Sequence, residues 1–497
     1  MQNQVRLTPI DRIKRAIVAQ YPILYLRTWE EDRAEKMVQS IAKSFSQTVP
    51  IYIWTVSEGL RDAKSTVPAT TDPAKAIDFI IKEGEPGFYI LKDFPTFLKD
   101  NPTLIRRMRD AYYALKEKAR FLVLISTTFS LPEELSKEVH LIDVPLPGED
   151  EIGPLLDFVS TRYFRAPIAD ERLRNNMIIG LKGLTINEIN HVLNALFFGQ
   201  PQFHSVMIEQ VLTEKEQITK KDGLLEFIFP RFRVEDVGGY AVLKDWLAKR
   251  AKIFNKEAEK SGVSVPKGLL MMGISGCGKS LAVKVVSTLW NLPLFRLDMS
   301  NVFSGAYGAP EQAFSRAIST IEAVSPAVLW IDEIESGMIG VKEGASGSAS
   351  RIFATFLTWM QEKDALVFVA ATANRIDLLP AEFIRKGRFD QVFFLDLPDE
   401  EERKSIFSVH LTRKGADLNR FDLIILAKAT PDWNGAEIEQ AVLSAAVEAF
   451  NEGQPLSQNH ITRIITRTIP LSRTMTEQIK YIKSWAHTRA LNASRMQ

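Results

Sequence analysis

Short apolar runs bounded by turn residues alternate along this chain with longer stretches in which apolar positions recur every three or four residues. This alternation is typical of βα units, in which buried parallel strands are joined by helices. We expect buried strands at residues 23–26, 51–54, 88–91 and 121–125, and again at 269–272, 294–297, 328–331 and 366–370. The pattern therefore predicts an α/β fold with parallel sheets flanked by helices.

The second half of the chain repeats features of the first half. Residues 121–135 are similar to residues 366–383, and residues 139–152 are similar to residues 392–406. Because similar segments keep nearly one offset across different elements, we predict tandem copies of one domain. The alternative is a chance similarity between two generic α/β domains.

The connection between the two copies is expected within residues 216–235, where a polar stretch passes into a segment rich in Phe and Pro. This gives three predicted parts: an N-terminal domain at 1–225, an α/β domain at 226–400, and a helical lid with a C-terminal helix at 401–497.

Composition narrows the class of protein further. A chain of 497 residues with 45% apolar and 25% charged residues is typical of a globular protein of more than one domain. The net charge of +1 argues against nucleic acid as a partner, since no chain-wide basic surface is expected. Cys277 is the single cysteine, so no intrachain disulfide can form. We find neither a signal peptide nor an apolar run of about 18 residues, and expect a cytoplasmic protein without a membrane span.

A phosphate-binding loop is the strongest motif in the sequence. It follows a predicted strand and precedes a helical stretch, as the pattern G-x-x-x-x-G-K-[ST] requires. Its residues are Gly273, Ile274, Ser275, Gly276, Cys277, Gly278, Lys279 and Ser280. Backbone N–H groups of such a loop converge on phosphate oxygens, the lysine reaches the β- and γ-phosphates, and the serine hydroxyl can ligate Mg²⁺. The alternative is a tight glycine-rich turn with an exposed lysine.

Polar residues at the ends of two later strands complete a candidate hydrolytic site. Asp332 and Glu333 follow the apolar strand at 327–331, which suits an acid that holds Mg²⁺ and a base that polarises the attacking water. Asn374 follows the next strand and could orient that water. Arg385 and Arg388 come a few residues later, and planar guanidinium groups suit the charge of a γ-phosphate. Taken singly, each of these residues also has an ordinary structural interpretation.

The second half, residues 234–497, resembles the AAA subgroup of the AAA+ ATPases. The segment 234–239 (VEDVGG) is similar to the opening segment of that family, and 374–379 (NRIDLL) to its sensor-1 region. Residues 434–437 (NGAE) occupy the lid-helix position, and 470–472 (PLS) resemble the C-terminal end. The resemblance implies ATP and Mg²⁺ as cofactors and a homo-oligomer, expected to be a hexamer.

The same resemblance implies roles for further residues. It places Arg385 and Arg388 at two arginine-finger positions that face a neighbouring subunit's nucleotide. It also implies that the nucleotide is lined by Asp236, Val237, Gly238, Leu281 and Ala436.

Two positions depart from the family pattern. The pore loop reads Ala306-Tyr307-Gly308, so its aromatic residue is shifted by one position, which puts peptide threading in question. Cys277 stands where the family usually has Thr. Its thiol lies at a helix N-terminus beside Lys279, an environment that lowers a thiol pKa; the alternative is a small residue that merely fits the loop.

The first half is expected to be a copy that has lost ATP chemistry. Where the phosphate loop should follow its strand, residues 27–32 read RTWEED, with neither glycine nor lysine. Three acids there would repel a triphosphate. Lys92 stands where the metal-holding aspartate should be. An unrelated α/β domain is the alternative. This two-part layout resembles the AAA ATPases of cyanobacterial genomes and red-algal plastids, which would make the plastid stroma a second expected location.

These features together predict an ATP-hydrolysing ring that remodels or regulates a protein client, recognised through the N-terminal domain. An ATP-switched oligomeric scaffold without substrate threading is the alternative. A motor acting on DNA is a third reading, disfavoured by the balanced charge.

Overall fold

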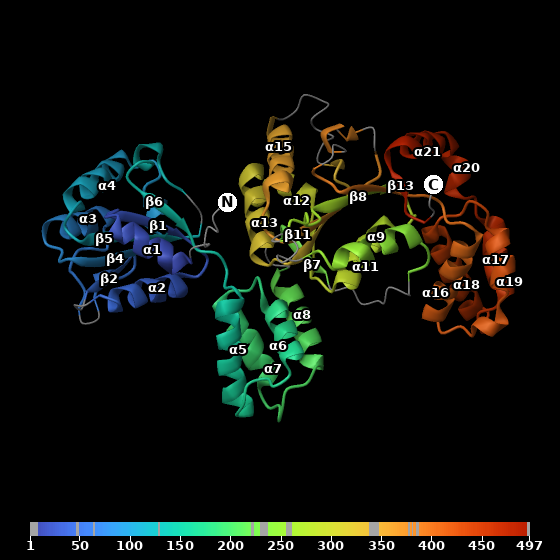
Figure 1. Ribbon diagram of the computed structural model, residues 1–497, viewed down its shortest axis with the longest axis horizontal. Coiled ribbons are helices and arrows are strands. Elements are labelled where there is room, and N and C mark those ends of the chain that lie inside the picture. The colour runs from blue at the N-terminus through green and yellow to red at the C-terminus, as the bar shows by residue number, and fades with distance from the viewer. Residues whose placement is uncertain are drawn as a thin grey trace. The chain divides into compact units, whose positions relative to one another are not determined.

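The computed structural model of the chain describes residues 8–45, 49–62, 65–127, 130–219, 223–228, 237–254, 261–336, 347–375, 378–379, 381–383 and 387–494 (Figure 1). The chain divides into two compact units, Met1–Phe203 and His204–Gln497, and each is described by itself. None of the helices in the described ranges is long and apolar enough to span a membrane.

The first unit is built on a twisted sheet with helices on both faces. In its described residues the sheet has six strands in the order β3-β2-β4-β5-β1-β6, all parallel except β3, which runs antiparallel to β2. Its helices and strands are α1 Pro9–Val18, β1 Ile23–Arg27, α2 Glu31–Lys43, β2 Ile51–Thr55, β3 Gly59–Arg61, α3 Pro73–Lys82, β4 Gly87–Lys92, α4 Pro102–Leu115, β5 Arg120–Ser126, β6 His140–Asp143, α5 Glu149–Phe164, α6 Glu171–Leu181 and α7 Ile186–Phe197.

Alternate strand residues of this unit face two separate cores, because successive side chains of a strand point to opposite faces. Tyr25 and Leu91 lie in the core covered by α3 and α4, whereas Leu24 and Ile90 lie in the core covered by α1 and α2. After β6, helices α5, α6 and α7 pack on one another. The unit is therefore a three-layer α/β domain followed by a small helical part.

The second unit repeats this plan. Its sheet has seven strands in the described ranges, in the order β13-β12-β8-β11-β10-β9-β7, with β7 antiparallel at one edge. Its helices and strands are α8 Val206–Thr219, β7 Leu225–Ile228, α9 Ala241–Ala251, β8 Gly268–Gly273, α11 Lys279–Trp290, β9 Leu294–Leu297, α12 Met299–Phe303, α13 Pro310–Ala323, β10 Ala327–Ile331, α15 Gly347–Glu362, β11 Val367–Ala373, β12 Gln391–Leu395, α16 Glu400–Arg413, α17 Leu423–Ala429, α18 Gly435–Asn451, α19 Gln458–Arg467, α20 Leu471–Thr474, α21 Thr476–Arg489 and β13 Leu491–Asn492.

The central strands of the second sheet are buried on both faces, as continuous apolar runs such as β10 predict. One face packs against α12, α13 and α15, and the other against α9 and α11. Helices α16 to α19 enclose a separate small core and form the lid. Each of α16 and α18 begins with a capping box, in which the side chains of Asp399 and Asn434 accept from the backbone N–H three residues later.

The two sheets share one topology. The strand order of the first sheet, β6-β1-β5-β4-β2-β3, matches that of the second sheet, β12-β8-β11-β10-β9-β7, strand for strand. Each sheet also has an antiparallel strand at the same edge, β3 in the first and β7 in the second. The predicted α/β fold with two copies of one module is thereby confirmed. All eight strands expected from the apolar runs are present, while β3, β6, β7, β12 and β13 are additional.

The division between the units falls at Phe203, before the connection expected at 216–235. The physical reason lies in the pairing of β7, which joins β9 of the second sheet, and in the packing of α8 against β7. The ammonium group of Lys215, on α8, lies 5.1 Å from the ring centroid of Phe227 and 5.4 Å from that of Phe295. Residues 206–219, expected at the end of the first domain, therefore pack with the second unit.

Candidate nucleotide site

The predicted phosphate loop, acids and amide meet at one edge of the second sheet. Strands β8, β11 and β10 are parallel neighbours in that order, so their carboxyl ends lie side by side. The loop after β8 leads into Lys279, β11 leads to Asn374, and β10 leads to Asp332. Ligands of open α/β sheets bind at this edge.

The backbone of the loop requires glycine at two positions. Gly276 and Gly278 both have φ of +80°, a left-handed conformation that residues with a side chain rarely adopt. A Cβ on Gly276 would lie 2.7 Å from the amide nitrogen of Asn434, and one on Gly278 would collide with the hydroxyl of Tyr240. The loop is thus closely enclosed by the segment before α9 and by the lid.

Lys279 is the first residue of α11 and is only 8% exposed. Its ammonium group donates to the carbonyl oxygens of Gly273 at 2.9 Å and Ile274 at 3.0 Å. Burial lowers its pKa, while the nearby carboxylates of Glu335, Asp332 and Glu333 oppose that shift. The lysine therefore folds back onto its own loop, where the charges of three acids partly offset the effect of burial on its pKa.

Asp332 and Glu333 are held by a hydroxyl of the neighbouring strand. The side chain of Thr372, in β11, donates to Asp332 Oδ1 at 2.6 Å and accepts from the backbone N–H of Glu333 at 3.0 Å. Glu333 has φ of +44°. This turn leaves the Glu333 side chain exposed at the sheet edge, whereas Asp332 is half-buried.

Asn374 contacts the candidate base directly. Its amide Nδ2 donates to Glu333 Oε1 at 2.7 Å. Glu335, which is 4% exposed, accepts at Oε1 from the backbone N–H groups of Asn374 at 2.6 Å and Arg375 at 3.0 Å. Burial raises the pKa of Glu335. Glu335 therefore fixes the loop that carries Asn374, and Asn374 in turn orients Glu333.

Oxygen ligands suited to Mg²⁺ are present on both sides of this edge. Ser280 is exposed at the second position of α11, and the carboxylate of Asp332 lies at the end of β10. A hydroxyl and a carboxylate are the hard donors that Mg²⁺ prefers, with water and phosphate supplying the remaining positions. The donor set therefore fits a Mg²⁺ bound together with a nucleotide.

The lid helix α18 begins against the loop. The backbone N–H of Ala436 donates to the carbonyl of Gly276 at 3.2 Å, and Asn434 Nδ2 donates to the carbonyl of Ser275 at 3.2 Å. Val237 is buried, and a Cβ on Gly238 would lie 3.1 Å from Ser405 Cβ of α16. The segment before α9, the loop and the lid thus lie in contact with one another. Leu281 follows in α11, half-buried against the core.

Cys277 does not have the environment of a reactive thiol. The side chain is 4% exposed, and burial raises its pKa from 9.0 to about 12 despite the charge of Lys279. The expectation of a lowered pKa at this helix N-terminus is therefore wrong. Desolvation in the core between β8 and α11 exceeds the attraction of one ammonium group.

Arg388 and Tyr307, which the structure describes, are not part of this cluster. Arg388 is half-buried, and its guanidinium donates to the carbonyl of Glu382 at 2.6 Å. Tyr307 packs on the core of the second unit, with its hydroxyl where a Cβ of Gly223 would be. Asp236 and Arg385 lie outside the residues that the structure describes.

Sequence reasoning missed Thr372, Tyr240 and Arg296 as residues of the site. Thr372 stands two positions before Asn374, a spacing that places both on one face of a strand. Tyr240 follows two glycines, and its hydroxyl donates to the carbonyl of Cys277, a contact that no local pattern indicates. Arg296 is a charged residue in an otherwise apolar strand, and this pattern could have indicated that the residue belongs to a site.

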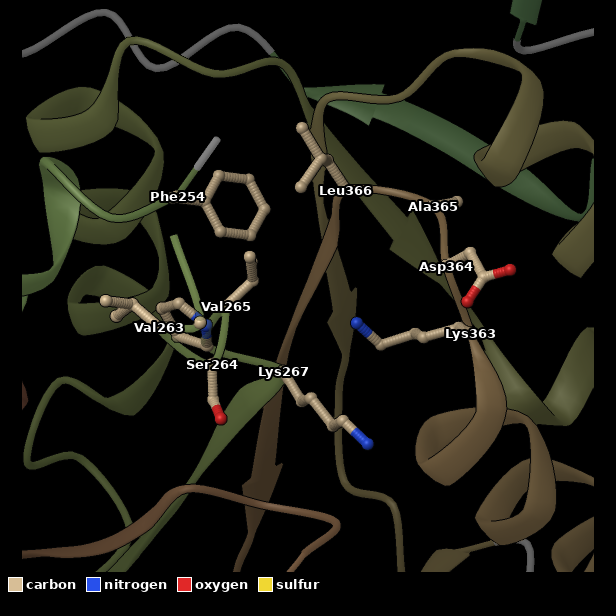
Figure 2. A pocket seen from close by; sticks show the side chains of 11 residues that line it. Phe254, Val263, Ser264, Val265, Lys267, Lys363, Asp364, Ala365 and Leu366 are labelled. Carbon is tan, nitrogen blue, oxygen red and sulfur yellow. The ribbon is translucent and has the colours of Figure 1, made fainter. Parts of the chain in front are cut away.

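A hollow of about 310 Å³ lies at the other end of the same sheet (Figure 2). It is lined by Lys267 and Leu366, which directly precede β8 and β11, together with Phe254 and Lys363. Burial lowers the pKa of Lys363 to about 8. Since parallel strands begin at this edge, the hollow is remote from the phosphate loop.

In the first unit the corresponding edge is filled with ion pairs. The turn between β1 and α2 has three residues, 28–30, whereas the phosphate loop has five residues, 274–278, between β8 and α11. Lys92, at the end of β4, lies 3.4 Å from Glu31 and 3.2 Å from Glu35. Burial disfavours its charge, but hydrogen bonds and the charges of both acids outweigh burial and raise its pKa.

Two family profiles match the two modules. One described as "SpoVK-like AAA ATPase, N-terminal domain" matches residues 9–144, and one described as "ATPase family associated with various cellular activities (AAA)" matches residues 269–397. With its two sheets, its phosphate loop and these matches, the chain belongs to the AAA ATPase family.

Relatives match over nearly the whole chain. The protein "Uncharacterized AAA domain-containing protein ycf46" of Guillardia theta is 36% identical over 97% of this chain and 96% of its own length. The protein of the same name from Pyropia yezoensis is 37% identical over 97% of this chain and 98% of its own length. The "ATP-dependent zinc metalloprotease FtsH 3" of Petrotoga mobilis is 29% identical over 51% of this chain and 41% of its own length. The two-module layout is therefore shared with the ycf46 proteins.

Proposed function

We propose that this chain hydrolyses Mg-ATP in a homohexameric ring and uses the cycle to remodel or regulate a protein client. The observation that carries the proposal is the meeting of Lys279, Asp332, Glu333 and Asn374 at one sheet edge. The first module would recognise the client or an adaptor. We propose the cytoplasm or a plastid stroma as its location.

In the proposed reaction Lys279 exchanges the two loop carbonyls for phosphate oxygens, which are better partners for an ammonium group. Ser280 and Asp332 would hold Mg²⁺, which supplies charge neutralisation for the phosphates. Glu333 accepts the proton of the attacking water, and Asn374 keeps the Glu333 carboxylate aimed at the edge. Arg385 and Arg388 would act on the nucleotide of a neighbouring subunit.

Substitution of the base tests this assignment. Glu333→Gln should retain ATP binding and lower hydrolysis by about 10²- to 10⁴-fold, since an amide cannot accept the proton. Glu362→Gln, an exposed site at the end of α15, is the matched control and should hydrolyse at the parent rate. A Glu333→Gln chain that turns over normally would show that another group is the base. The same variant, held in its ATP state, would also serve to capture the client from its native extract.

A second function, an ATP-switched scaffold without threading, is favoured by the position of Tyr307. Its ring packs on the core of its own unit and its hydroxyl lies against Gly223, while Asn301 Nδ2 donates to the Gly223 carbonyl at 3.0 Å. A side chain packed in this way is not free to contact a peptide during threading. If the scaffold is correct, Tyr307→Ala should leave ATP hydrolysis and client handling unchanged. Loss of client handling with hydrolysis intact would instead support threading.

A further inference from the structure

Arg296 lies in β9, the strand between β7 and β10 of the second sheet. It is paired with Glu226 of β7 on one side and with Trp330 of β10 on the other. Its guanidinium carbon lies 5.2 Å from the Trp330 ring centroid. Asp332 follows Trp330 by two residues, so its side chain leaves β10 on the same face. The strand register therefore places Arg296 next to Asp332, the candidate metal ligand.

The Arg296 guanidinium is shared between two acids. Its Nη2 lies 3.4 Å from Asp332 Oδ2, and its Nη1 lies 3.8 Å from Glu226 Oε2. Both distances are longer than a strong charge-assisted hydrogen bond of about 2.7–2.9 Å. Among the described residues, its buried Nε has no hydrogen-bond partner. The cation is thus confined near Asp332 without being bound tightly to either acid.

This position has a consequence for a divalent cation. Thr372 already donates to Asp332 Oδ1, so Arg296 faces the remaining oxygen, Oδ2. A permanent positive charge beside that oxygen lowers the affinity of Asp332 for another cation through Coulomb repulsion and competition for one acceptor. Glu226 attracts the same guanidinium from the opposite side and therefore weakens that competition.

We propose that Arg296 is a positioning residue that competes with the divalent cation for Asp332, and that Glu226 on β7 sets the strength of this competition. The proposal rests on the proposed function, because it concerns the metal bound with the nucleotide. It makes the edge strand β7 a part of the site through one chain of charges, Glu226 to Arg296 to Asp332.

The experiment uses the full chain with saturating ADP and measures Mn²⁺ binding by electron paramagnetic resonance, without hydrolysis. Arg296→Gln should tighten Mn²⁺ binding on the order of fivefold, the size expected for a partly exposed charge pair. Arg296→Lys keeps the charge and should stay within about twofold of the parent. Glu226→Gln should shift the affinity in the opposite direction, weakening it by about twofold. Arg351→Gln, which removes an arginine paired with Glu311 away from the site, is the control and should have no effect.

Opposite shifts for Arg296→Gln and Glu226→Gln, with Arg296→Lys close to the parent, would support the proposal. Unchanged or weaker Mn²⁺ binding by Arg296→Gln would overturn it, as would equal shifts for the Gln and Lys variants, since these would report packing rather than charge. A parent chain that binds ADP and Mn²⁺ normally in that experiment leaves the proposed function standing. A parent chain that binds neither would overturn both.

Discussion

The two modules of this chain share a strand order and differ in charge at the same edge of the sheet. In the second module a cation, Lys279, lies at the end of the loop after β8, and an acid, Asp332, directly follows β10. In the first module the signs are exchanged, with acids on α2 and Lys92 at the end of β4. The charges of the second module are complementary to a metal–nucleotide complex, whereas those of the first are complementary to one another.

The helical parts differ in the same way. In the second unit the N-terminus of α18 meets the backbone of the phosphate loop, through Ala436 and Gly276. In the first unit the N-terminus of α7 meets a side chain, because the backbone N–H of Ile186 donates to Glu30 at 2.6 Å. Glu30 also pairs with Arg33 at 2.7 Å. The same position is thus closed by contacts with the loop backbone in the second unit and by hydrogen bonds and ion pairs of Glu30 in the first.

Replacing one lysine in each module gives the sharpest contrast between the modules. Lys279→Ala should abolish ATP binding and hydrolysis, because the phosphates lose their main cation. Lys92→Ala should leave both at the parent level and loosen α2 and β4 by about 2 kcal/mol, since Glu31 and Glu35 lose their partner. Calorimetry with ATP and amide hydrogen exchange over α2 measure the two effects. ATP binding that depends on Lys92 would contradict an inactive first module.

The residues three positions before the matching strands β12 and β6 offer a second test. Arg388 precedes β12 and Lys137 precedes β6. If the second module is completed by a neighbouring subunit, Arg388→Ala should bind ATP normally and lose on the order of 10³-fold in hydrolysis. Lys137→Ala is the matched control and should hydrolyse at the parent rate.

Mixing two inactive chains decides whether this arginine acts between subunits. Rings that combine Arg388→Ala with Lys279→Ala should regain activity, because some interfaces join an intact loop to an intact arginine. Mixed rings that form and stay inactive would exclude action in trans, and so would a monomer with full activity.

Arg33 tests the internal closure of the first module. The side chain is 8% exposed and donates to Glu30, to Glu151 at 2.5 Å and to the carbonyl of Pro145 at 2.6 Å. Arg33→Met should destabilise this unit by about 3–5 kcal/mol, because Glu30 remains buried without its cation. The unfolding transition of the first unit, followed by hydrogen exchange in the full chain, gives the value. Adding Glu30→Gln to Arg33→Met should recover part of the lost stability of the first unit. No recovery would show that the destabilisation does not come from the buried charge of Glu30.

The last prediction concerns the reactivity of Cys277. With its pKa raised to about 12 from 9.0, the fraction of thiolate at pH 8 falls by about three orders of magnitude, so alkylation by iodoacetamide should be slow until the chain unfolds. Since the folded-state pKa is the higher one, the neutral thiol contributes stability below about pH 9 that is lost as the pH rises towards about 12. Cys277→Thr should remove this pH dependence. Fast alkylation of the folded chain at pH 8 would contradict the burial of the Cys277 thiol.

Much of this protein could be predicted from local patterns. Apolar runs indicated eight of the strands, and the glycines and lysine of residues 273–280 indicated the phosphate loop, because strand burial and loop geometry are imposed on neighbouring residues. Edge strands such as β7 could not be predicted in this way, since a four-residue strand with one paired side depends on a distant partner. The same limit applies to Tyr240, whose contact with Cys277 joins two separate segments.

What the sequence by itself determined is the class of chemistry: a loop for phosphates, an acid pair after an apolar strand, and a first module without either. What the tertiary structure decided is which charges face one another. The pKa of Cys277 rises because desolvation depends on the whole core around it, which the neighbouring helix N-terminus does not reveal. Arg296 reaches Asp332 because β9 lies beside β10, and the strand register is a property of the sheet rather than of either segment.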